Sequence, residues 1–274
     1  LLAKRPGLAA QVRSLSISNQ RETYVVFDRA TGRPLHNAVV WLCRRGEAIC
    51  RRLVEAGHED RVHELTGLKI DTYFPASKLA ALLGERPDLA QQLADGDALF
   101  GTIDAYLIYR LTGGAVYATD HTNASRTLFY DITQLGWSEE LLALFGVRLG
   151  RLPDIRESCA LFGSTDLEGR LPAGVNGPLP ICGVMGDSQA AFFAQRCFTP
   201  GSAKITFGTG SSVLMNIGER PVLSPSGIVT AIGWVLDGRP TYAFEGITNF
   251  TGATIAWLRD QLQLIDDVAA TEEV

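Results

Sequence analysis

Residues 179–195, LPICGVMGDSQAAFFAQ, constrain the fold more than any other part of the sequence. The first part of this stretch is almost entirely apolar, which is typical of a short strand buried on both faces. Gly186 interrupts the pattern, and small and apolar residues at helical spacing follow from Asp187. The sequence therefore predicts a strand, a glycine turn and a helix, the unit from which open α/β sheets are built.

Asp187 occupies the position between the predicted strand and the predicted helix. A carboxylate there can cap the helix, and Asp187 or Ser188 is a suitable N-cap. Open α/β sheets also bind their ligands at this position, where a carboxylate can serve as a general base. Because aspartate is a common N-cap, the stretch alone favours the capping interpretation.

The remaining sequence up to Cys197 alternates between strand and helix patterns. Strands are expected at residues 14–18, 23–27 and 35–41, the last two as a hairpin. Helices are expected at 47–56, 58–65, 76–83, 87–93, 104–111 and 138–145. Residues 150–177 are rich in glycine and proline, and we expect connecting structure there.

After Cys197 the pattern changes to a strand meander followed by one helix. Strands are expected at 203–207, 211–216, 227–236 and 239–244, and a helix at 251–262. A second domain therefore begins near Pro200, and we divide the chain into residues 1–198 and 199–274.

Composition excludes several classes of function. The net charge is -5 and no dense basic block occurs, which argues against a nucleic-acid partner. No apolar run could span a bilayer and no signal peptide opens the sequence, so a cytoplasmic protein without integral membrane association is expected. The five cysteines are scattered, form no zinc pattern and are expected to be reduced and buried.

Two pairs of residues in the first part suit a small polar ligand. Arg21 and Glu22 place a donor fork beside an acceptor, as a polyhydroxy compound requires, although a surface ion pair is the alternative. On one regular strand they would face opposite sides, so both reach one ligand only if the backbone turns. Trp41 and Tyr73 could wall a pocket against a carbon skeleton, or belong to the core.

Gly208, Thr209 and Gly210 form a predicted tight turn directly after a strand. Such a turn exposes backbone N–H groups and a hydroxyl that suit phosphate oxygens, although ordinary hairpins use similar turns. The longer phosphate-loop motif and the dinucleotide-binding fingerprint do not occur in the sequence.

Several motifs in a fixed order resemble one family. They are NQRETYVVFDRATGRPLHNAVVW, DTYFPASK, FGTIDAYLIYRLTGG, TDHTNASRTLFYDI, GDSQAAFFAQ and FGTGSSVLMNIGERPVLS. The sequence resembles the FGGY carbohydrate kinases, and the glycerol kinases among them. The resemblance implies an α/β fold of the actin-like ATPase type, with two ribonuclease-H-like domains and ATP-dependent phosphorylation of glycerol to glycerol 3-phosphate.

The resemblance also implies that the family pattern is truncated at both ends. The first strand pair and its phosphate loop would lie before Leu1, and the rest of the nucleotide domain after Val274. We therefore expect the chain alone to be inactive. Its partners would be a small polyol and ATP with Mg²⁺, and the enzyme is expected to form a homo-oligomer.

Roles follow by motif. The resemblance makes Asp187 the general base and gives it an indirect role in binding Mg²⁺. Residues expected to bind the polyol are Arg21, Glu22, Trp41, Tyr73, Asp187, Ser188 and Ser212. Residues expected to contact the ATP phosphates are Gly208, Thr209, Gly210 and Gly252.

Three positions depart from the family pattern. Ser188 and Ala256 stand where glutamines are usual, and Ser212 stands where a phenylalanine is usual. The two serines make the pocket roomier and more polar, which suggests a larger polyol or sugar such as a tetritol, a pentitol or a ketose. A non-catalytic relative remains an alternative. A Gly-Asp-Ser esterase with Ser188 as nucleophile is disfavoured, because no histidine follows it.

Overall fold

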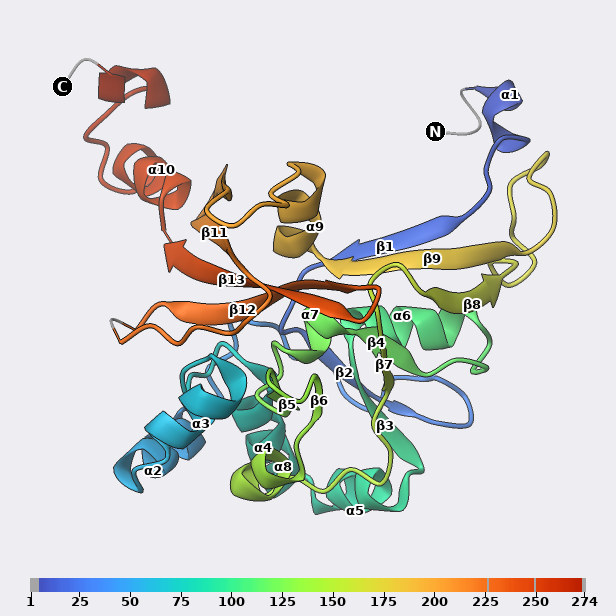
Figure 1. The fold of residues 1–274 in the computed structure, drawn as a ribbon, viewed down its shortest axis with the longest axis horizontal. Coiled ribbons are helices and arrows are strands. Elements are labelled where there is room, and N and C mark those ends of the chain that lie inside the picture. The colour runs from blue at the N-terminus through green and yellow to red at the C-terminus, as the bar shows by residue number, and fades with distance from the viewer. Residues whose placement is uncertain (1–4, 226, 249, 273–274) are drawn as a thin grey trace.

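The computed structural model describes residues 5–225, 227–248 and 250–272. Strands and helices alternate through the first part of the chain, and a four-stranded antiparallel sheet follows (Figure 1). The helices are α1 Pro6–Ala9, α2 Glu47–Glu55, α3 Glu59–Thr66, α4 Pro75–Glu85, α5 Pro87–Asp95, α6 Ile103–Leu111, α7 His121–Ala124, α8 Glu139–Phe145, α9 Asp187–Ala194, α10 Gly252–Asp260 and the 3-10 helix Val268–Glu272. The strands are β1 Leu15–Asn19, β2 Tyr24–Asp28, β3 Ala98–Thr102, β4 Ala118–Asp120, β5 Tyr130–Asp131, β6 Gly136–Trp137, β7 Asp154–Arg156, β8 Leu161–Thr165, β9 Leu179–Gly186, β10 Ala203–Phe207, β11 Ser211–Gly218, β12 Val229–Leu236 and β13 Arg239–Thr248.

The central strand–turn–helix unit is present as predicted, as β9 and α9. β9 lies between β1, to which it is parallel, and β8, to which it is antiparallel. Its burial alternates, since Ile181 and Val184 are buried while Cys182 is exposed. The prediction of burial on both faces was wrong: Ile181 and Val184 belong to the core cluster that includes Ile108 of α6, whereas on the other face Cys182 is exposed and Met185 is only partly buried.

The predicted hairpin of residues 23–41 was wrong in its second strand. β2 pairs along its whole length with β3, which the sequence analysis missed. Only two isolated bridges, Tyr24 with Val39 and Phe27 with Pro34, connect β2 to the expected partner segment. Every residue of β3 is buried, so β2 and β3 pair as two apolar strands in the interior. Residues 150–177 also contain two strands, β7 and β8, rather than connecting structure alone.

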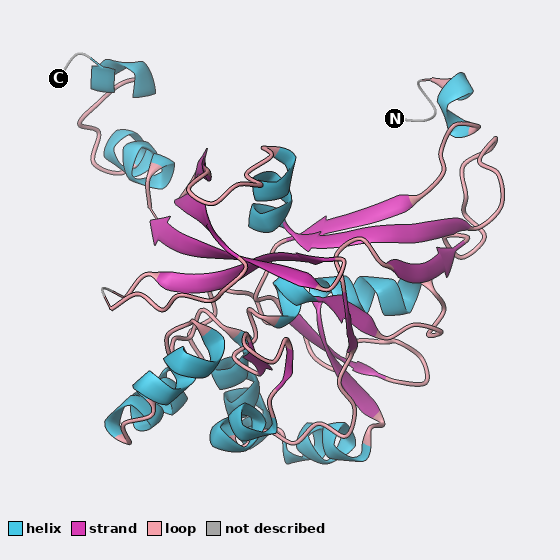
Figure 2. Cartoon of the chain, in the orientation of Figure 1, coloured by secondary structure: helices cyan, strands magenta, loops and turns pink. Residues whose placement is uncertain are grey.

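The second sheet has the order β10-β11-β13-β12, and its four strands are those predicted after Cys197. Figure 2 shows its strands in magenta crossing the middle of the molecule above most of the helices. The sheet packs on the first part of the chain through Ile232, Val235 and Tyr242, and the Tyr242 hydroxyl donates to the Ile132 carbonyl at 2.6 Å. α10 lies apart from this body, and no residue of α10 is buried (Figure 1).

Two expectations about surface chemistry can be compared with the described residues. All five cysteines are free, but Cys159 and Cys182 are exposed, so the expectation of burial was wrong for these two. Cys182 occupies an exposed position of β9, and Cys159 lies in the turn that precedes β8. No helix in the described ranges is both long and apolar enough to cross a membrane.

Candidate active site

The candidate site forms where two parallel strands end side by side. In the β1–β9 ladder Asn19 lies opposite Gly186, so the residues that follow each strand meet. Arg21 Nε lies 3.7 Å from Asp187 Oδ1. A Cβ atom at position 186 would lie 2.7 Å from two carbons of the Arg21 side chain. Glycine is therefore required there, because it lets Arg21 pass across the end of β9.

The backbone turns at Glu22, as the sequence analysis required for a shared ligand. Glu22 has φ of 62°, a left-handed conformation that is uncommon for a residue with a side chain. Arg21 and Glu22 consequently line the same cavity. Their exposed fractions are 5% and 2%, so the interpretation as a surface ion pair was wrong.

A buried network of ion pairs holds these two residues. Arg21 Nη2 donates to Glu245 Oε1 at 2.8 Å, and its Nη1 donates to Gln189 Oε1 at 3.1 Å. Arg126 Nε donates to Glu22 Oε1 at 2.6 Å, and its Nη1 donates to Glu245 Oε2. Glu245 belongs to β13 of the second sheet, whereas both arginines belong to the first part of the chain. The network fixes the Arg21 guanidinium with its Nε edge towards Asp187.

The charges in this network stabilise one another. Burial by itself raises the pKa of Glu245, but Arg126 and Arg21 outweigh burial and hold that pKa at about 2. Burial likewise lowers the pKa of Arg21, yet Glu245 and Glu22 outweigh it and the net shift is upward. Both groups therefore stay charged at neutral pH.

A buried polar layer supports the strand ends from behind. The Asp120 carboxylate caps α7 by accepting from the Asn123 backbone, and it also accepts from the hydroxyls of Thr122 and Ser158. Asn19 Nδ2 donates to Asn123 Oδ1 at 2.8 Å, and the Gly186 N–H donates to Thr122 Oγ1 at 2.9 Å. The ends of β1 and β9 are thus tied to one helix N-terminus.

Two aromatic side chains form another wall of the cavity. The rings of Trp41 and Tyr73 lie 5.5 Å apart between centroids, and both line the cavity. The buried Lys78 ammonium donates to the Tyr73, Val40 and Trp41 carbonyls at 2.9, 3.2 and 3.4 Å. Burial lowers the pKa of Lys78 to about 8. Lys78 therefore ties together the two segments that carry the aromatic rings.

The predicted cap at the start of α9 was wrong. The N-cap is Gly186, and among the described residues no side chain caps this helix. Asp187 is the first helical residue, and its Oδ1 accepts only from the adjacent Ser188 N–H, at 2.7 Å. With 57% of its side chain exposed, Asp187 points into the cavity region rather than into the helix end. The geometry leaves this carboxylate accessible to a ligand.

The predicted phosphate turn lies at another edge of the same cavity. Thr209 and Gly210 line it together with Ser211 and Ser212. The first N–H groups of α10 donate to carbonyls of the turn, with Gly252 N to Gly208 O at 3.0 Å. A Cβ atom at Gly252 would lie 2.6 Å from the Gly208 oxygen, so glycine permits this close contact.

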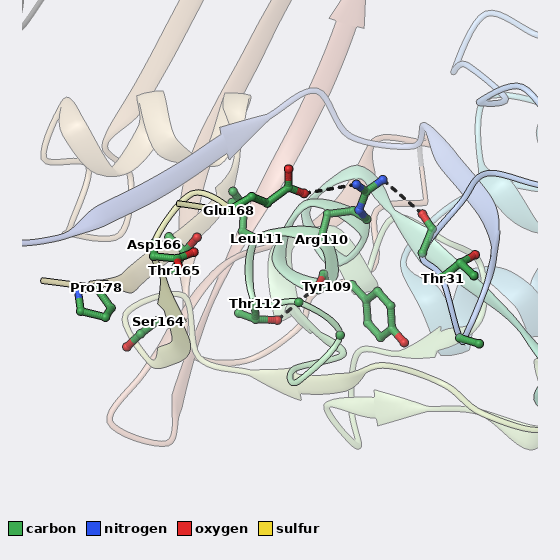
Figure 3. Close-up of a pocket in the computed structure, with 14 residues that line it drawn as sticks. Thr31, Tyr109, Arg110, Leu111, Thr112, Ser164, Thr165, Asp166, Glu168 and Pro178 are labelled. Atoms are coloured by element: carbon green, nitrogen blue, oxygen red, sulfur yellow. Dashed lines mark hydrogen bonds and ion pairs between the residues drawn. The ribbon is translucent and has the colours of Figure 1, made fainter. Parts of the chain in front are cut away.

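The cavity around Asp187 has a volume of about 270 Å³ and gathers all the predicted polyol residues. A larger cavity of about 770 Å³ lies elsewhere, between Thr31, Arg110, Thr112 and Glu168 (Figure 3). In Figure 3 Arg110 is already engaged by Glu168 and by a backbone carbonyl near Thr31. We consider the smaller cavity the functional one, because convergent polar groups rather than volume define a site.

The side chains in the described ranges form no cluster of three or more His, Cys, Asp or Glu that could hold a metal ion. A site built wholly from protein ligands is therefore not present among these residues. A single accessible carboxylate beside a phosphate turn fits Mg²⁺, which usually binds through one or two carboxylates and substrate phosphates. Asp187 is the residue that meets this description.

Sequence reasoning missed four charged residues that build the site. Arg126 belongs to a polar cluster that the sequence displays, and Glu245 directly precedes a glycine at the end of a predicted strand. Lys78 and Lys204 interrupt otherwise apolar or small-residue stretches. A charged residue inside a predicted buried segment is the signal that could have identified them.

Comparison with protein families matches both parts of the chain. Residues 5–194 match the model of the FGGY family of carbohydrate kinases, N-terminal domain, and residues 203–274 match the C-terminal domain of the same family. The chain belongs to the FGGY family of carbohydrate kinases. The α/β fold expected from the resemblance, the actin-like ATPase fold of these sugar kinases, is confirmed.

Relatives of this FGGY chain include two bacterial glycerol kinases. The chain is 48% identical over 263 residues to a glycerol kinase of Halorhodospira halophila, covering 96% of this chain and 51% of that protein. It is 44% identical over 264 residues to glycerol kinase 1 of Thermotoga maritima, covering 96% and 53%. The FGGY chain thus spans about half the length of the curated relatives it matches.

Solved structures give the same relationship. A Plasmodium falciparum glycerol kinase with ADP is 36% identical, with a TM-score of 0.88, over 96% of this FGGY chain and 51% of that chain. A ligand-bound xylulose kinase from Lactobacillus acidophilus is 20% identical, with a TM-score of 0.79, over 93% and 51%. The second likeness supports the fold alone.

Proposed function

We propose that the protein carrying this chain catalyses the ATP-dependent phosphorylation of glycerol to glycerol 3-phosphate. The observation that carries the proposal is the position of the Asp187 carboxylate, which is accessible in the cavity that Arg21, Glu22 and Thr209 also line. The relatives that match at 44–48% identity bear the name glycerol kinase, which supports the same reaction.

The proposed mechanism assigns one task to each side chain. Trp41 and Tyr73 bind the carbon skeleton, while Arg21 and Glu22 bind hydroxyl groups of the polyol. Asp187 accepts the proton of the attacking polyol hydroxyl while the oxygen of that hydroxyl forms a bond to the γ-phosphorus of ATP. The bond from that phosphorus to the β–γ bridging oxygen breaks, and ADP leaves with the electron pair.

Phosphate binding is assigned to the turn beside α10. Thr209 offers a hydroxyl to the phosphates, and Gly208, Gly210 and Gly252 allow the backbone to approach them. Mg²⁺ would supply charge neutralisation on the phosphates, and Asp187 would contribute to holding it indirectly. We assign polyol binding to a domain of residues 1–198 and nucleotide binding to the domain that begins at residue 199.

The decisive variant is Asp187→Asn in the complete gene product, assayed by ADP release with glycerol. We expect kcat to fall about 10²–10⁴-fold, because an amide cannot accept the proton. The fold should persist, since the Asp187 side chain is 57% exposed and caps no helix. Ser138→Asn, at the N-cap of α8, is the matched control and should retain activity.

Two outcomes would contradict this function. Near-normal turnover in Asp187→Asn would exclude its role as general base. Absence of ADP release by the unmodified protein with every polyol would favour a non-catalytic FGGY relative instead.

A further inference from the structure

Lys204 is a buried lysine behind the wall of the cavity, bonded to two residues that line it, and the proposed mechanism does not use it. It lies on β10 two residues before Thr206, so the two side chains share a face of the strand. Ser212 of β11 lies directly opposite Thr206. Lys204 Nζ donates to Thr206 Oγ1 and to Ser212 Oγ, at 2.9 Å in each case.

The Lys204 ammonium lacks an acidic partner of its own. The residue is 1% exposed, and its hydrogen-bond partners in the described ranges are the two hydroxyls rather than a carboxylate. Burial lowers the pKa of Lys204, Arg21 lowers it further, and Glu245 and Asp187 raise it, so the lysine lies in the field of the candidate site. A buried charge without an ion pair is costly unless hydrogen bonds or a ligand compensate it.

The ammonium determines which way the two hydroxyls can bond. An ammonium group only donates, so Thr206 and Ser212 must each use a lone pair to accept from Lys204. Each hydroxyl keeps its own O–H for a further acceptor. In the described part of the chain neither O–H donates to another side chain, and both residues line the cavity. This wall therefore presents two hydrogen-bond donors to a ligand.

We propose that Lys204, Thr206 and Ser212 form a donor subsite for an additional oxygen of the phosphoryl acceptor. The inference rests on the proposed function and extends its substrate class from glycerol to linear polyols of four or more carbons. Arg21 and Glu22 hold hydroxyls on the wall that β1 supplies, and the small side chains of Ser188 and Ser212 leave room towards the opposite wall. A fourth hydroxyl of a longer polyol reaches that wall and accepts hydrogen bonds from the Thr206 and Ser212 hydroxyls, whereas glycerol has only three oxygens.

The test compares erythritol with glycerol as acceptors for the complete gene product. We expect kcat/KM for erythritol to equal or exceed that for glycerol. Ser212→Ala and Ser212→Phe should each lower kcat/KM for erythritol about tenfold, mainly through KM, and should lower the ratio of the erythritol value to the glycerol value. Lys204→Met should act in the same direction, because the hydroxyls then turn to other partners.

Controls and contrary outcomes separate this inference from the proposed function. Ile205→Met, on the opposite and exposed face of β10, should leave the preference unchanged. Equal losses with both acceptors would mean that the subsite serves the phosphoryl group, and a preference for glycerol above tenfold would also overturn the proposal. If no polyol is turned over, calorimetric binding of erythritol that Ser212→Phe weakens tenfold keeps the subsite and excludes the kinase activity. If no polyol is turned over and Ser212→Phe does not weaken erythritol binding, both the subsite and the kinase activity are excluded.

Discussion

The two walls of the candidate site differ in how firmly the protein holds them. On the polyol wall Arg21, Glu22, Arg126 and Glu245 are at most 5% exposed and bond to one another. On the phosphate wall the residues around the β10–β11 turn are open to solvent, and Phe207 is 80% exposed. If Arg21 and Glu22 bind the polyol as proposed, they are fixed in advance, because preorganised donors and acceptors need no rearrangement on binding.

Because the polyol wall depends on buried ion pairs, a change at Glu245 tests most directly how much this wall contributes to stability. The Glu245 carboxylate comes from the second sheet, yet it forms ion pairs with two arginines of the first part of the chain. It therefore couples the packing of the two parts to the orientation of Arg21. A side chain in such a network cannot be removed without leaving buried charge unpaired.

The largest expected effect in this comparison is that of Glu245→Gln. We expect the free energy of unfolding to fall by about 3–5 kcal/mol, because both guanidiniums lose their shared counter-charge while buried. Urea unfolding measures the change. Glu219→Gln, whose exposed carboxylate lies 4.0 Å from Arg239, is the matched control and should shift stability by less than about 0.5 kcal/mol. Equal losses of stability in the two variants would contradict the claim that the buried network holds the polyol wall more firmly than the phosphate wall is held.

An intermediate effect is expected from Asp104, a buried residue of α6 whose carboxyl group accepts from the Thr119 hydroxyl at 2.6 Å. Burial, with Asp120 nearby, raises the pKa of Asp104 to about 7. The unfolded chain releases this proton near pH 4, so stability falls as the pH rises from about 4 through 7. Asp104→Asn should therefore gain about 1–3 kcal/mol more, relative to the unmodified protein, at pH 8 than at pH 5.

Thermal or urea unfolding at both pH values checks this prediction. The difference between the two pH values isolates the titration from any constant cost of the buried amide. A difference that is the same at pH 5 and pH 8 would show that Asp104 titrates normally in the folded protein.

The smallest effect is expected on the phosphate wall, for Phe207→Ser. Because the ring is 80% exposed, little apolar surface returns to water and stability should change by less than about 0.5 kcal/mol. Urea unfolding beside the Glu245 variant gives the sharpest form of the comparison. A loss near that of Glu245→Gln would mean that the phosphate wall is packed as firmly as the polyol wall.

Local pattern predicted most of the elements and failed where pairing is long-range. The β9–α9 unit, the other helices of seven or more residues and the four strands of the second sheet follow from apolar periodicity and turn residues, whereas the four-residue helices α1 and α7 were not predicted. The pairing of β2 with β3 could not be predicted from this pattern, because residues 34–39 have a similar pattern and lie nearer to β2 in the sequence. The N-cap of α9 was predicted to be the side chain of Asp187 or Ser188, but the N-cap residue is Gly186. Glycine is needed there because Arg21 passes close to its Cα.

The sequence by itself determined that Asp187 stands between a buried strand and a helix, and that the motifs are those of an FGGY kinase. Only the tertiary structure decided which groups surround that carboxylate. Glu245 meets Arg21 across 224 positions of the chain, and Lys204 meets Ser212 across a strand pair. Such contacts carry no local signature, because burial and charge pairing act on distances in space rather than on neighbours in sequence.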